Sequence, residues 1–114
     1  MNTANAVRAD VLRGTLDLLI LKTLDSVGPL HGYGIAQRIQ QVSASALSLN
    51  QGTLYPALLR LEQRRWIRSR RGVSDNNRRA RYYALTATGR RQLRQETADW
   101  LRASSIVNTI LATE

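Results

Sequence analysis

The spacing of apolar residues changes period twice along the chain, and this change restricts the possible fold more than any other feature. Three segments, at positions 10–27, 32–42 and about 50–64, repeat apolar residues at three- and four-residue intervals, which is typical of helices with one buried face. Two strand-like segments follow at 66–73 and 78–85, and a last helical segment extends from Thr86 to about Leu111. The order predicts an α+β winged helix-turn-helix, in which positions 46–49 could supply a third strand.

The third helical segment has two candidate starting points. Either Asn50 or Thr53 can cap it, and Pro56 leaves the choice open because proline beyond the first turn costs ~3 kcal/mol. Gly52 leaves this end free of bulk, so its N–H groups could approach a phosphate. The inner faces of the second and third helices are expected to consist of Ile35, Ile39, Val42, Leu54, Leu58, Leu59 and Leu61.

Positive charge is concentrated in one stretch. Nine of the sixteen arginines lie between Arg60 and Arg81, accompanied only by the acids Glu62 and Asp75, so this stretch carries +7 of the formal net charge of +9. Such a concentration repels itself unless a polyanion binds to it. Nucleic acid is the leading candidate partner, and the arginine-rich hairpin and the end of the third helix near Gly52 should then lie on one exposed flank.

Composition excludes several other classes of protein. With 114 residues and 43% apolar content, the chain is expected to form one core. It has no cysteine, which suits the reducing cytoplasm where we expect it, and no run approaching the ~20 apolar residues of a membrane span. The acids are scattered, without a nucleophile elbow or a glycine-rich phosphate loop, so we expect neither an enzyme nor a cofactor. The sole histidine, His31, lacks partners for a metal site and is interpreted as structural, bonding to the backbone.

The last helix carries a heptad-like seam. Its members recur in steps of four and three, and they are Leu93, Thr97, Trp100, Ser104, Val107 and Leu111. The helix has more apolar surface than a small domain can cover, so a second copy should cover it. We therefore divide the chain into a winged helix-turn-helix domain, residues 1–85, and a dimerisation helix, residues 86–114. Trp100 could line an effector pocket at the dimer centre, but packing is the favoured interpretation.

Four segments together closely resemble the PadR family of bacterial transcriptional regulators. They are LDLLILKTL at 16–24, HGYGIAQRI at 31–39, GTLYPALLRLEQ at 52–63 and YYALTATGRRQL at 82–93, and the ending resembles the branch with a single short C-terminal helix. The resemblance implies a homodimeric winged-helix repressor, with the helix of Gly52–Leu61 in the DNA major groove and the hairpin on the flanking backbone. It implies small-molecule sensing only in some members.

Two positions depart from the family pattern. Arg65 stands where glycine is usual, and a non-glycine residue in the left-handed conformation costs roughly 1–2 kcal/mol. Trp66 stands where a smaller aliphatic residue is common. Both changes fall at the corner between the third helix and the wing, so they put the angle of the wing in question.

Candidate DNA contacts come from three places. At the start of the third helix, Gln51 could bind adenine and the Thr53 methyl could touch thymine, although Thr53 could instead be the cap. Tyr55 is expected to divide its ring and hydroxyl between the core and a phosphate, with packing in the core alone as the alternative. Tyr33 and Arg38 of the second helix are further phosphate candidates, with a structural role for Tyr33 equally open. The hairpin candidates, which could alternatively form a solvated charged face, are Arg70, Arg71, Arg78, Arg79 and Arg81.

The sequence thus predicts a homodimeric repressor that binds double-stranded DNA at a palindromic operator, with half-sites about one helical turn, or a multiple of it, apart. One alternative is a basic helical oligomerisation module that binds acidic protein or an anionic membrane surface. Another is an RNA-binding winged helix, although the aromatic signature of common RNA-binding domains is missing.

Overall fold

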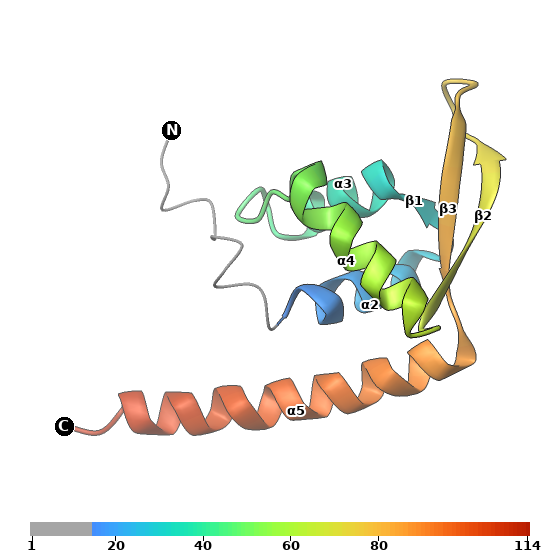
Figure 1. Ribbon diagram of the computed structural model, residues 1–114. Coiled ribbons are helices and arrows are strands. Elements are labelled where there is room, and N and C mark those ends of the chain that lie inside the picture. The colour runs from blue at the N-terminus through green and yellow to red at the C-terminus, as the bar shows by residue number, and fades with distance from the viewer. Residues whose placement is uncertain (1–14) are drawn as a thin grey trace.

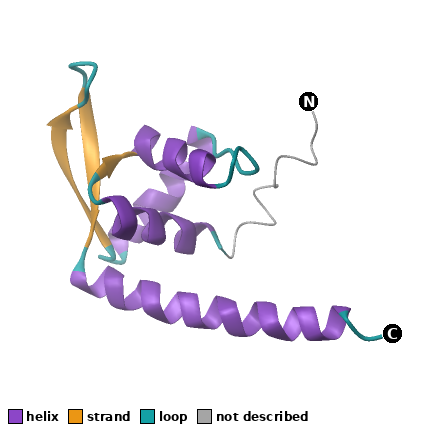
Figure 2. Ribbon diagram, turned by 180° about the vertical axis from the view of Figure 1, so that it is seen from behind, coloured by secondary structure: helices purple, strands orange, loops and turns teal. Residues whose placement is uncertain are grey.

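The computed structural model describes residues 15–114, and its helices and hairpin follow the predicted order (Figure 1). A helical half packs against a three-stranded wing, and one long helix runs beneath both (Figure 2). The elements are α2 (Leu16–Val27), β1 (Leu30–His31), α3 (Gly32–Val42), α4 (Gln51–Gln63), β2 (Ile67–Val73), β3 (Arg79–Leu85) and α5 (Ala87–Leu111). Positions 10–14 of the first predicted helix lie outside the described residues.

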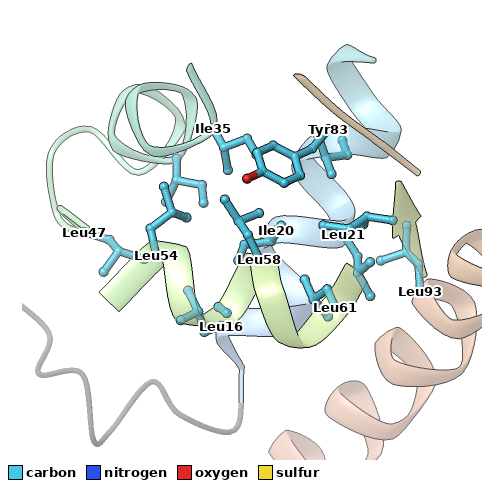
Figure 3. Close-up of a cluster of buried hydrophobic side chains, with 14 residues drawn as sticks. Leu16, Ile20, Leu21, Ile35, Leu47, Leu54, Leu58, Leu61, Tyr83 and Leu93 are labelled. Carbon is cyan, nitrogen blue, oxygen red and sulfur yellow. The ribbon is translucent and has the colours of Figure 1, made fainter. Parts of the chain in front are cut away.

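The core lies where α2, α3 and α4 meet the base of the wing and the first half of α5 (Figure 3). Its fully buried large side chains are Ile20, Leu21, Ile35, Leu54, Leu58, Leu61 and Ile67. The prediction that Val42 and Leu59 lie on the inner faces is wrong, because their side chains are 70% and 58% exposed. Val42 is the last residue of α3, and Leu59 is turned about 100° around the α4 axis from its buried neighbour Leu58.

The sheet has the order β1-β3-β2 and is antiparallel throughout. The prediction that positions 46–49 could supply the third strand is wrong, because β1 fills that place. Leu30 pairs with Tyr83, and His31 pairs with Tyr82. A strand of two residues depends on these distant partners, so its own sequence carries too little pattern to indicate it.

Side-chain caps fix where three of the helices begin. Nδ1 of His31 accepts the N–H of Gly34 at 2.9 Å, which confirms the structural interpretation of that histidine. Oδ1 of Asn50 accepts the N–H of Thr53 at 2.9 Å, so α4 starts early and Pro56 lies in its second turn. Thr86 caps α5 as predicted, by accepting the N–H of Gly89 at 2.9 Å.

The corner between α4 and the wing keeps the conformation that glycine favours. Arg65 has φ +62°, the N–H of Arg65 bonds to Glu62 O at 2.9 Å, and the N–H of Trp66 bonds to Leu61 O at 3.1 Å. These two bonds form a Schellman motif that ends α4. The Thr86 hydroxyl contacts the carbonyl oxygens of Arg65 at 2.7 Å and Trp66 at 3.0 Å. The start of α5 is therefore attached to the same corner.

Candidate nucleic-acid interface

The wing and the starts of α3 and α4 border one groove of about 570 Å³. It is lined by residues from three separate parts of the sequence, among them His31, Tyr33, Gln51, Tyr55, Arg78, Arg79 and Arg81. The expectation that the arginine hairpin and the start of the third predicted helix share one flank is thereby confirmed. The groove joins a cationic edge to the N-terminal end of a helix, which is a favourable setting for a phosphate chain.

The start of α4 leaves its first side chains available. Gln51 and Gly52 are exposed, and Gln51 lines the groove. Because Asn50 caps the helix, Thr53 does not, and its half-buried side chain is left for another use. The capping alternative for Thr53 is therefore wrong.

The two tyrosines of the groove differ in their packing. Tyr55 is 42% exposed, and a Cβ atom added at Gly32 would lie 2.6 Å from its hydroxyl oxygen. The missing side chain of Gly32 thus makes room for the end of the Tyr55 ring. Tyr33 is more exposed, with its ring 6.3 Å from that of His31. Arg38 is exposed as well, but it lines a neighbouring hollow between the end of α2 and α3.

Strand register divides the hairpin arginines between the two faces of the wing. Arg71 pairs with Arg81, and Arg79 pairs with Val73, on the face that also carries Tyr83. Arg70 pairs with Tyr82 and lies on the opposite face. Sequence reasoning treated these arginines as one set, whereas the structure brings only Arg78, Arg79 and Arg81 to the groove.

Within residues 15–114, four predicted phosphate contacts, Arg70, Arg71, Arg78 and Arg79, form no ion pair with an acidic side chain. Other arginines of the same stretch are used internally. Arg60 pairs with Asp17 at 2.6 Å and joins α4 to α2, while the guanidinium of Arg64 stacks 5.1 Å from the centre of the Trp66 ring. Among the described residues, the charges of these four wing arginines are therefore not neutralised by an acidic partner and remain available to a polyanion.

Arg81 is the exception among the hairpin candidates. Its Nη1 donates to Ser69 Oγ at 2.9 Å, and Ser69 Oγ donates to Glu62 Oε2 at 2.6 Å. Close by, burial raises the pKa of the Tyr83 hydroxyl, and the Arg81 charge partly offsets this rise. Sequence reasoning assigned no role to Ser69 or Glu62, because neither lies next to Arg81 in the chain.

The predicted seam of α5 divides at the edge of the core. Leu93 is 5% exposed and packs within its own chain, whereas Trp100 is 48% exposed and Val107 and Leu111 are more so. Thr97 is also exposed and Ser104 half-buried. The stripe that buries Leu93 thus continues outward as exposed apolar surface.

None of the helices within residues 15–114 is long and apolar enough to cross a membrane.

Comparison with models of known protein families identifies one family. The family model described as "Transcriptional regulator PadR-like family" matches residues 20–95. An uncharacterised protein of Lysinibacillus sphaericus is 31% identical over 106 residues, which span 92% of this chain and 95% of that protein.

Solved structures with this fold are similar along most of the chain. A transcriptional regulator from Clostridium thermocellum superposes with a TM-score of 0.80 at 31% identity, covering 88% of this chain and 96% of that one. A PadR-like transcriptional regulator from Bacillus cereus gives a TM-score of 0.77 at 26% identity, covering 92% and 99%.

Proposed function

The chain belongs to the PadR-like family of transcriptional regulators, whose members bind DNA and are not enzymes, and we propose that it is a repressor that binds a palindromic promoter operator as a homodimer. Repression follows if the bound dimer occupies promoter DNA. The observation that carries the proposal is the groove in which wing arginines face the exposed start of α4. Family membership also favours this function over the acidic-protein, membrane and RNA alternatives.

In the proposed complex, α4 enters the major groove with its N-terminal end leading. Gln51 binds a base edge, the Thr53 methyl lies against a base, and Gly52 allows close approach. The hydroxyls of Tyr55 and Tyr33 bind phosphate, as does Arg38 on α3. The wing then contacts flanking phosphates through its exposed arginines, Arg70, Arg71, Arg78, Arg79 and Arg81.

The dimer in this proposal forms through the C-terminal helix of residues 86–114, next to a winged domain of residues 1–85. Support comes from the exposed apolar side chains of the outer half of α5, which are Trp100, Leu101, Ile106, Val107, Ile110 and Leu111. A second copy would bury this stripe and the neighbouring seam residues. An effector seated beside Trp100 remains a prediction, which quenching of the Trp100 fluorescence by added ligand would test.

The decisive experiment is a titration of the purified protein against the promoter DNA of its own gene at several salt concentrations. We expect tight binding to that duplex, weaker binding to a random duplex, and affinity that falls steeply with salt. Footprinting should reveal two protected half-sites about one helical turn, ~34 Å, or a multiple of it, apart. Equal affinity for both duplexes would contradict the proposal.

A further inference from the structure

Hydrogen bonds between side chains connect the last turn of α4 with both strands of the wing. Glu62 belongs to α4, Ser69 to β2 and Arg81 to β3. The Glu62 carboxylate accepts the Ser69 hydroxyl at 2.6 Å, and that hydroxyl oxygen accepts an N–H of Arg81 at 2.9 Å. We name these three residues the Glu62–Ser69–Arg81 relay.

Chemistry fixes the direction of both bonds. An ionised carboxylate only accepts and a guanidinium only donates, so the single proton of Ser69 points to Glu62 and its lone pairs face Arg81. Both bonds involve a charged partner, which makes them shorter and stronger than neutral ones. Among the described residues, Nε and Nη2 of Arg81 form no hydrogen bond, and Arg81 lines the groove.

From this geometry, and resting on the proposed function, we propose that Glu62 is a positioning residue for DNA binding. Acting through Ser69, it holds the Arg81 guanidinium at the groove with two nitrogen atoms left for a phosphate oxygen. A free arginine side chain loses rotamer entropy when it binds, and prior ordering reduces that loss. The relay also links the wing to α4, so it limits how far the hairpin can move away from that helix.

The direction in which Glu62→Ala changes the DNA affinity separates a positioning role from a purely electrostatic one. Glu62 is an acid beside a surface that binds phosphates, so a purely electrostatic role predicts that Glu62→Ala strengthens DNA binding. Positioning predicts the opposite, because the loss of the carboxylate frees Ser69 and then Arg81. Ser69→Ala breaks the relay without any change of charge, and Ser69→Thr keeps the hydroxyl as the matched control.

The experiment is a double-mutant cycle on Ser69→Ala and Arg81→Ala, measured on the promoter duplex and on a random duplex. We expect Ser69→Ala to weaken binding about threefold to tenfold, which corresponds to one ordinary hydrogen bond, and Ser69→Thr to bind as the wild type does. In the Arg81→Ala background, Ser69→Ala should add less than about a twofold loss, because its effect passes through Arg81. Thermal melting of each variant checks the fold.

A full multiplicative loss in the Arg81→Ala background, or wild-type affinity for Ser69→Ala, would overturn the relay. Tighter binding by a folded Glu62→Ala variant would also overturn it. A wild-type protein without preference for the promoter contradicts the proposed function instead. The coupling between Ser69 and Arg81 stays measurable in that case, because the random duplex reports phosphate contacts independently of sequence.

Discussion

The wing and the outer half of α5 are both surfaces without a partner in the described chain, but they expose opposite chemistry. The wing presents arginines without acidic partners, whereas α5 beyond Leu93 presents an apolar stripe that includes Trp100 and Val107. Charges are well solvated when no ligand is bound, while apolar area favours burial at any salt concentration. The difference suggests a stable contact at α5 and a reversible, salt-dependent one at the wing, so added salt should release DNA before the dimer dissociates.

The largest expected effect comes from making the apolar surface charged. Trp100→Glu should destabilise the proposed dimer by about 3 kcal/mol or more, because a carboxylate would be buried in the interface without a partner. Analytical ultracentrifugation should then detect monomers, and operator affinity should fall. The matched control is Arg102→Gln, on the opposite side of α5, which lowers the net charge by the same one unit. Retained dimers in the Trp100 variant would mean that other surfaces hold the pair.

A second substitution tests base contact at the start of α4. Gln51→Ala should cost ~1–3 kcal/mol of binding free energy at one base position, if the amide binds a base edge. Competition with operator variants changed one base pair at a time would locate that position. Gln63→Ala, at the far end of the same helix, is the control and should bind like the wild type. Equal losses on operator and random DNA would refute the role of Gln51.

A third substitution tests whether the wing contacts DNA phosphates. Arg79→Ala should weaken binding to all sequences and lower the slope of log affinity against log salt by ~1, because one phosphate contact is removed. Arg90→Ala removes the same charge from an arginine that pairs with Asp25 on α2, and it should leave the slope unchanged. Identical slopes for the two variants would count against the wing as a DNA contact.

The smallest effect is expected at the corner between the wing and α4. Arg65→Gly should raise the free energy of unfolding by about 1 kcal/mol, because Arg65 has φ +62° and glycine adopts that conformation without strain. Arg64→Gly is the opposite control, since Arg64 has right-handed helical geometry and glycine there costs ~0.5–1 kcal/mol. Chemical denaturation should therefore displace the two midpoints in opposite directions. A lower midpoint for Arg65→Gly would contradict the assigned strain.

Local pattern was enough to predict most of the fold. The helices around Ile35 and Leu58, the hairpin, and the cap at Thr86 follow from periodicity and capping chemistry within a few residues. The third strand was placed wrongly, because Leu30 and His31 become a strand only through pairing with Tyr83 and Tyr82. Pattern reasoning also misjudged Leu59, since an apolar residue next to the buried stripe carries no signal of its own exposure.

The candidate site was predictable in composition but not in arrangement. Charge concentration identified the hairpin, yet strand register decides that Arg71 and Arg70 lie on opposite faces. The relay through Ser69 depends on contacts between residues seven and twelve positions apart. Such contacts depend on how the wing packs on α4, and this packing cannot be predicted from a short stretch of sequence.

The hydrogen bonds from Thr86 to the carbonyl oxygens of Arg65 and Trp66 attach the start of α5 to the same corner from which the hairpin begins. A side chain at Gly89 would collide with the carbonyl oxygen of Trp66, at 1.9 Å from an added Cβ, so the two elements are seated closely there. From this attachment point, α5 extends for about 37 Å, at 1.5 Å per residue. Small rotations at the corner would become displacements of several ångströms at the far end of the helix, and the spacing between paired subunits would be correspondingly sensitive to them.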